Sequence, residues 1–178
     1  DWVSLVSGAD AALVPVQADA WATAQAALQA EDRGRFADAL EHWHRLLERH
    51  ADTLSTTRAT FGSLATQRIE RLLDLGGRQL YAPFEARAGE ELDAALADED
   101  LERLEALPQR FPFSDAATGA QRAIQRVALR NNDVERLARV TSELLSVTLD
   151  RRDELQLRVD LAIGLGRAGH RAFERGLL

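Results

Sequence analysis

"ATAQAALQAEDRGRFADALEHWHRLLERHAD", residues 22–52, contains the pattern that decides the fold. Alanines recur through its first half, Gly34 interrupts it, and Phe36, Ala39 and Trp43 recur at three- and four-residue steps in the second half. Because about 3.6 residues complete one helical turn, this spacing puts the aromatic side chains and the small ones on matching helix faces. The stretch therefore predicts two helices that a tight turn joins and that small residues allow to approach closely.

The remainder of the chain has the same helical character. Ala, Leu, Glu, Arg and Gln dominate it, runs of β-branched residues are missing, and no segment alternates with period two for long enough to predict a sheet. Helices are expected over about 20–32, 36–50, 56–75, 81–97, 100–107, 115–130, 133–148 and 151–166, with another from about 170. The predicted fold class is all-α, after an irregular lead-in over 1–18.

Local residues set the expected helix ends. Asp19 and Ser55 are predicted N-caps, because short polar side chains accept hydrogen bonds from the free N–H groups of a first turn. Gly76-Gly77 and the stretch 166–169 are predicted to end helices, since glycine readily adopts positive φ. Pro108 is expected to stop a short helix. The other predicted starts are Ser114 or Asp115, and Asp133.

The opening stretch resembles the tetratricopeptide repeat, in which a small-residue helix, a turn glycine, an aromatic residue and an Ala-x-x-x-aromatic step follow one another. It departs from that family where the first helix usually carries a large aromatic and a Leu-Gly pair, and where a proline follows the second helix. The resemblance implies antiparallel helix pairs stacked as a right-handed solenoid, in one repeat domain over 19–178. The implied units are about 19–51, 81–112, 115–149 and 151–178, with the helix over 56–75 inserted.

A second resemblance covers the stretch from residue 81 to residue 133. This stretch is similar to the helical-repeat segment that precedes quinoprotein-like β-propellers in some bacterial envelope proteins. The residues that carry the likeness are Tyr81, Phe84, Arg110, Phe111, Pro112, Ser114 and Ala116-Ala117. It implies a structural segment or subunit docked permanently in a larger assembly, such as one at the cell envelope.

Composition narrows the possible partners. The net charge is -7, with -4 on residues 1–50, -5 on 51–100 and +2 on 101–178, so binding to nucleic acid is not expected. No apolar run reaches the roughly 20 residues of a membrane helix. There are no cysteines, which excludes disulfides and leaves a cytoplasmic or a periplasmic location open. Because the sequence begins at Asp1 and holds no Met, we interpret it as a processed chain or a fragment.

Three of the four histidines, His42, His44 and His50, lie within nine positions and raise the question of a metal site. On a helix the side chains of His42 and His44 point about 160° apart, on opposite flanks of the face that holds Trp43. Glu41 and His44 match half of a helical di-iron motif, but no second Glu-x-x-His exists in the chain. We therefore predict no metal site and a buried Trp43 between adjacent helices.

Three other patterns have simple structural interpretations. "GLGRAG", residues 164–169, spells a dinucleotide fingerprint but is interpreted as a repeat turn, since it follows a helical context. The acidic residues of 90–100 are interpreted as a solvated turn, because they lack the spacing of a calcium loop. Arg122, Arg126 and Arg130 form a stripe that is interpreted as a solvated face, with a docking surface for a carboxylate or phosphate as the alternative.

These observations predict a non-catalytic scaffold that binds a protein or peptide, with no cofactor and no catalytic residue. A permanently docked structural subunit is the alternative. Exposed residues of the first helix of a pair are expected to face the binding side of a repeat array. The predicted contact residues are Gln25, Gln29 and Asp32 in the first unit, and Gln121, Arg122 and Gln125 in the third.

Overall fold

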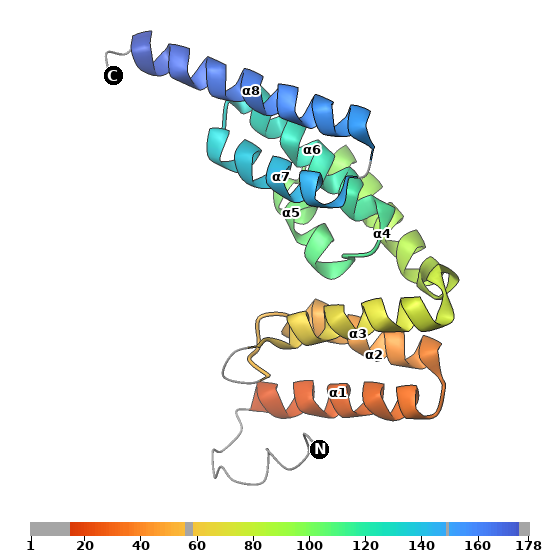
Figure 1. Ribbon diagram of the computed structural model, residues 1–178. Helices are drawn as coiled ribbons and strands as arrows, with labels where there is room; N and C mark the ends of the chain where they lie inside the picture. Colours follow the sequence, from red (N-terminus) through yellow and green to blue (C-terminus); the bar gives the residue numbers. More distant parts are fainter. Residues whose placement is uncertain (1–14, 56–58, 149, 175–178) are drawn as a thin grey trace. The chain divides into compact units, whose positions relative to one another are not determined.

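The computed structural model describes residues 15–55, 59–148 and 150–174, and these are folded into helices without a β-sheet (Figure 1). This confirms the all-α class. The helices are α1 (Pro15–Asp32), α2 (Phe36–His50), α3 (Phe61–Gly76), α4 (Ala82–Ala97), α5 (Leu101–Arg110), α6 (Asp115–Asn131), α7 (Val134–Val147) and α8 (Arg151–Glu174), with a short 3-10 helix, η2 (Arg78–Tyr81), before α4. Within the described ranges, no helix combines the length and the apolar character that crossing a membrane demands.

The helices gather into two compact units, one up to Leu80 and one from Tyr81 onward. In the first unit α2 packs against both α1 and α3. In the second unit α6 packs against α4, α5 and α7, and α8 packs against α7. Each unit has its own core, built mostly from helices that are neighbours in the chain. The single repeat domain over 19–178 stays a prediction.

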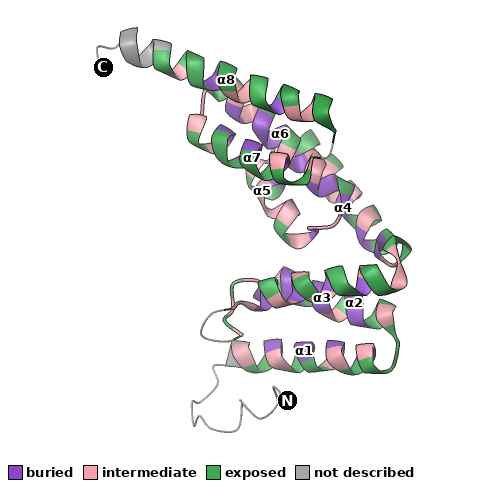
Figure 2. Ribbon diagram, in the orientation of Figure 1, coloured by how far each residue is buried: buried purple, intermediate pink, exposed green. Residues whose placement is uncertain are grey.

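Small residues of α1 form one side of the core of the first unit. Ala20, Ala24, Ala27 and Ala30 are at most 1% exposed and recur at three- and four-residue steps, on the face where Figure 2 shows buried residues. Because a methyl group takes little room, α2 can pack closely on this face. Trp43 of α2 is fully buried, at 0% exposure. Its predicted burial is confirmed.

One carboxylate in the last turn of α1 connects all three helices of the first unit. The indole Nε1 of Trp43 donates a hydrogen bond of 2.6 Å to Oε1 of Glu31. The other oxygen of Glu31 lies 3.5 Å from Nη1 of Arg68 on α3, and the glutamate side chain is only 15% exposed. A buried indole N–H needs an acceptor, so Glu31 allows Trp43 to occupy the core without an unsatisfied donor.

Substitutions at Glu31 test this arrangement. Glu31→Ala is expected to lower the free energy of unfolding by about 1–3 kcal/mol, because the indole N–H of Trp43 is left buried without an acceptor. Glu31→Gln keeps an acceptor oxygen, so it is expected to lower the free energy of unfolding by about 1 kcal/mol less than Glu31→Ala does. Urea unfolding followed by circular dichroism measures both variants. Equal losses for alanine and glutamine would contradict the role of the indole hydrogen bond.

The connection between α2 and α3 differs from the sequence-based expectation. Ser55, a predicted N-cap, instead donates a hydrogen bond of 3.0 Å from its hydroxyl to the carbonyl of Ala59. Thr60 is the N-cap of α3, and its hydroxyl accepts a first-turn N–H. At Gly62 an added Cβ would lie 2.7 Å from a backbone carbonyl oxygen at the end of α2, so glycine permits the two helices to meet. The expected end at Gly76-Gly77 is confirmed, with Gly77 at φ +86°.

The core of the second unit forms around α6. Its buried residues are Ala116, Ala117, Ala120, Ala123, Ile124, Gln125 and Ala128. Leucines of α5 and α7 are buried with them, including Leu104, Leu107 and Leu144. Polar caps start the helices: Ser114 accepts the backbone N–H of a first-turn residue of α6, and Asp133 does the same for α7. Both predicted starts are confirmed, because the capping side chains act locally.

One predicted helix start and one predicted helix end are wrong. Asp19 is not an N-cap, because α1 already begins at Pro15, where the fixed φ of proline suits a first turn. The predicted lead-in therefore includes helical residues from 15 to 18, and residues 1–14 lie outside the described ranges. Pro108 does not end α5, which continues to Arg110. Proline lies in the last turn of this helix, where the break costs little beyond one backbone hydrogen bond.

The turn predicted at 166–169 is also wrong, since α8 is continuous from Arg151 to Glu174. Glycine inside a helix costs only about 1 kcal/mol, which tertiary packing can offset. Gly164 is buried, and a Cβ added there would collide with the side chain of Leu137 on α7. Leu157 is buried as well, at 6% exposure. Among the described residues the predicted fourth unit is thus one long helix rather than a pair.

Candidate functional site

The first unit has an open groove of about 780 Å³ along α1 and α3, called here the α1–α3 groove. Its lining residues are Gln25, Leu28, Gln29, Glu31, Asp32, Phe36, Arg68, Arg71, Leu72 and Leu75. Gln25, Gln29 and Asp32, predicted as partner contacts, are all exposed on its α1 side. The structure therefore brings the three residues of the first unit together in one concave surface.

The chemistry of the α1–α3 groove is mixed. Leucines and one phenylalanine supply apolar surface, and Leu75 is 64% exposed, which is high for a large aliphatic side chain. Glu31 and Arg68, which also line the groove, lie 3.5 Å apart. Two glutamine amides and Asp32 line it from α1, and Arg71 lines it from α3. Amides both donate and accept, so the α1 edge can bond to a peptide backbone while the leucines contact its side chains.

The three predicted contact residues of the third unit are placed differently. Gln121 donates a hydrogen bond of 3.2 Å to Glu143 of α7. Arg122 forms an ion pair of 2.6 Å with Asp153 of α8. Gln125 is 5% exposed, and its amide faces a threonine hydroxyl of α7 at 3.5 Å. These side chains contact neighbouring helices of the second unit, and Arg122 and Gln125 line one pocket of about 200 Å³ together with Asp153 and Leu157 of α8.

Two of the three histidines of α2 are buried in the first unit. His44 and His50 are 1% and 8% exposed. Nε2 of His50 lies 3.0 Å from Oδ2 of Asp19, which connects the end of α2 to the start of α1. Among the residues that the structure describes, no three His, Cys, Asp or Glu side chains lie together as a metal ion would require. "GLGRAG" lies inside α8 with no strand before it, so it lacks the context of a dinucleotide site.

Three of the acidic residues of 90–100 make contacts inside the second unit. Both oxygens of Glu91 accept hydrogen bonds from Arg110, at 2.6 and 3.1 Å. Asp98 pairs with Arg103 at 3.0 Å. Asp100 is the N-cap of α5. These contacts agree with a turn rather than with a calcium loop, whose oxygens would converge on one point.

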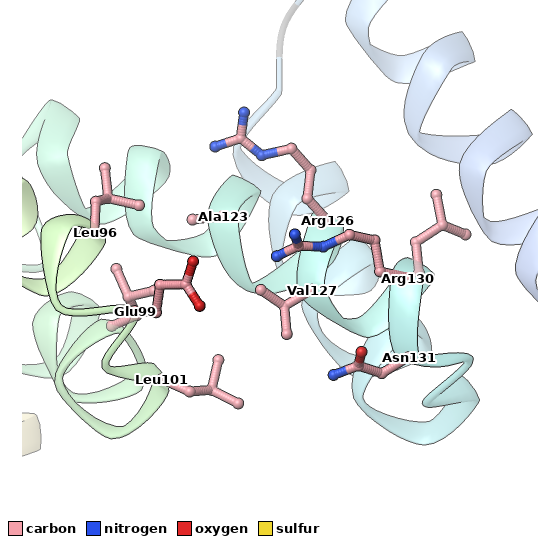
Figure 3. A pocket seen from close by; sticks show the side chains of 10 residues that line it. Leu96, Glu99, Leu101, Ala123, Arg126, Val127, Arg130 and Asn131 are labelled. Carbon is pink, nitrogen blue, oxygen red and sulfur yellow. The ribbon is translucent and has the colours of Figure 1, made fainter.

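A second groove, of about 760 Å³, was not predicted from the sequence. We call it the α4–α6 groove, and Figure 3 shows it with its side chains. It is lined by Leu96, Glu99, Leu101, Leu104, Ala123, Arg126, Val127, Leu129, Arg130 and Asn131. Sequence spacing identified Arg126 and Arg130 as neighbours on a helix face. Leu96, Leu101 and Leu104 come from α4 and α5, so the spacing along α6 could not reveal them.

No protein-family model matches this chain, and no curated protein or solved structure shows significant similarity to it. Both resemblances drawn from the sequence therefore remain proposals.

Proposed function

We propose that this protein is a non-catalytic interaction scaffold, which binds a protein or peptide partner through its helical surfaces. The α1–α3 groove is the observation that carries the proposal. It is open, it exceeds 700 Å³, and it combines exposed amides with aliphatic surface. Peptide-binding grooves of helical proteins use this combination, in which apolar contacts supply affinity and a few polar groups fix register.

The spacing of the α1 edge supports this use. Gln25, Gln29 and Asp32 are separated by four and three residues, so they form one row along the helix. Leu28 of the same helix and Leu72 of α3 line the groove together with this row. A ligand lying along α1 would meet polar contacts at one edge and aliphatic contacts inside. The resemblance to tetratricopeptide repeats also supports a right-handed array of antiparallel helix pairs, whose first helices line the binding side.

A permanently docked subunit is the second candidate function. It is favoured by α8, on which Leu155, Val159 and Ile163 are 55%, 49% and 41% exposed at four-residue spacing. This outward aliphatic row is what a helix covered in an assembly would present. A chain that purifies from its native source as a lone monomer would contradict this candidate.

Selection of peptides from a displayed library against the purified chain tests the scaffold proposal. Isothermal titration of the selected peptides is expected to give weaker binding to Gln29→Arg than to the parent, by about tenfold, because a long charged side chain then occupies the groove. Gln67→Arg is the matched control: Gln67 is an exposed glutamine of α3 that does not line the α1–α3 groove. Binding that falls equally in both variants, or a failure to select any peptide, would overturn the proposal.

A further inference from the structure

The α4–α6 groove combines partly exposed aliphatic side chains with two arginines that have no ion-pair partner among the described residues. We infer that it binds an acidic amphipathic helix of a partner protein, with the aliphatic face of that helix on the floor and its carboxylates at Arg126 and Arg130. This inference rests on the proposed scaffold function and names the kind of partner that the second unit accepts.

Aliphatic side chains from three helices make the floor of the groove. Leu96 comes from α4 and is 41% exposed. Leu101 from α5 and Val127 from α6 are partly exposed beside it. Leu104 and Ala123 close the floor underneath and are buried. A floor of branched aliphatic groups fits the leucines, isoleucines or valines of another helix.

Two arginines line this groove without an ion-pair partner among the residues that the structure describes. Arg126 and Arg130 lie one turn apart on α6, and both are exposed. Figure 3 shows their guanidinium groups extending from α6 toward the side of the groove where Glu99 lies. No ion pair joins either arginine to Glu99 or to another acid of the described chain. By contrast, Arg122, one turn earlier on the same stripe, is neutralised by Asp153.

The spacing of the arginines defines the ligand. Cβ atoms four residues apart on a helix are separated by about 5–6 Å, and a second helix repeats the same separation at its own i and i+4 positions. Each planar guanidinium can bind a carboxylate through two parallel hydrogen bonds. Two glutamates one turn apart, flanking an aliphatic row, would therefore meet both arginines at once.

The charges at the rim favour an acidic ligand over a neutral one. Arg126 and Arg130 outnumber Glu99, so the rim is positive although the whole chain carries -7. A neutral apolar helix would bury the floor but leave the two cations without counter-charges. A polyanion without aliphatic groups would satisfy the arginines but leave the floor uncovered. An acidic amphipathic helix satisfies both parts of the groove.

Three synthetic peptides of about 18 residues, long enough to form a helix, provide the test. They share one leucine row at i, i+3, i+4 and i+7 positions, and they differ only in the flanking residues, which are glutamate, glutamine or lysine. Fluorescence anisotropy of the labelled peptides measures their binding to the intact chain. The glutamate peptide is expected to bind at least about tenfold more tightly than the glutamine peptide, and added salt is expected to weaken that difference.

A matched pair of double variants locates the binding. Arg126→Gln with Arg130→Gln is expected to weaken binding of the glutamate peptide by about tenfold. Arg45→Gln with Arg49→Gln is the control, because these arginines of α2 are also exposed, also one turn apart, and line neither groove. The control variant changes net charge equally and is expected to keep binding within about twofold of the parent.

Two results would overturn this inference: equal loss in both double variants, which would indicate bulk electrostatics, or equal binding of the glutamate and glutamine peptides. Absence of binding up to about 1 mM would overturn it as well. The scaffold proposal is tested separately, by library-selected peptides and Gln29→Arg in the other unit. If those peptides bind the α1–α3 groove while the glutamate peptide fails, the scaffold function stands and the inference about the α4–α6 groove fails alone.

Discussion

Replacement of Trp43 by alanine is expected to lower the free energy of unfolding of the first unit by about 3–5 kcal/mol. The indole is fully buried, and its N–H donates to Glu31 at 2.6 Å. Alanine would remove the largest side chain of this core and leave a cavity that the surrounding helices fill only in part. It would also leave Glu31, a mostly buried carboxylate, without one of its partners.

Denaturant unfolding and hydrogen exchange measure this effect, with protection expected to fall in α1, α2 and α3. Trp43→Phe reduces the cavity, since it keeps a six-membered aromatic ring and removes the N–H together with the remaining atoms of the five-membered ring. It is expected to cost about 1–3 kcal/mol. Trp21→Ala is the control for loss of an indole, because Trp21 is only partly buried, with its ring 5.1 Å from that of Phe61. A loss below about 1 kcal/mol for Trp43→Ala would show that Trp43 does not hold this core together.

Phe111→Ala is expected to have a similar effect on the second unit, about 3–5 kcal/mol. Phe111 is 0% exposed and follows the last residue of α5. Its ring lies 5.3 Å from the guanidinium of Arg110 and 5.7 Å from that of Arg87, which adds cation–π contacts to its burial. Its backbone carbonyl accepts a hydrogen bond of 2.9 Å from the hydroxyl of Ser114, the N-cap of α6.

Phe113→Ala is the matched control, since Phe113 lies two residues away and is only partly buried. Its ring meets that of Tyr81 edge-on at 6.0 Å, so a smaller loss of about 1–2 kcal/mol is expected. Hydrogen exchange after Phe111→Ala should show lost protection in α5 and α6. Comparable losses for the two phenylalanines would contradict the special position of Phe111 at the α5–α6 connection.

The sequence predicted helix ends well where a local group determines them. Gly34 at φ +69°, Ser114 and Asp133 each form their turn or cap with backbone only a few residues away, so neighbouring residues are sufficient information. The predictions failed at 166–169, at Ser55, at Asp19 and at Pro108. At α8, packing of Gly164 and Leu157 on other helices supports a helix through glycines that would end it in isolation.

For the candidate site, the sequence predicted only which side chains share one face of a helix. Periodicity alone showed that Gln25, Gln29 and Asp32 share one face of a helix, and that face borders a groove. The same reasoning gave Gln125 in the third unit, where α7 covers it. Whether a polar face is free depends on which helix packs over it, and spacing within one helix does not contain that information. For the same reason, the α4–α6 groove required the structure.

The continuity of α8 also has a consequence for local unfolding. Gly164 packs against α7, but Gly166 and Gly169 are exposed, and a Cβ added at either would meet no neighbouring atom. Each exposed glycine therefore costs helix stability, by about 1 kcal/mol, without a packing contact in return. The distal part of α8 should open more readily than the part that holds Leu157, at a free energy well below that of global unfolding. Hydrogen exchange is therefore expected to be faster in the distal half of α8 than in its proximal half, while the core of the second unit stays protected.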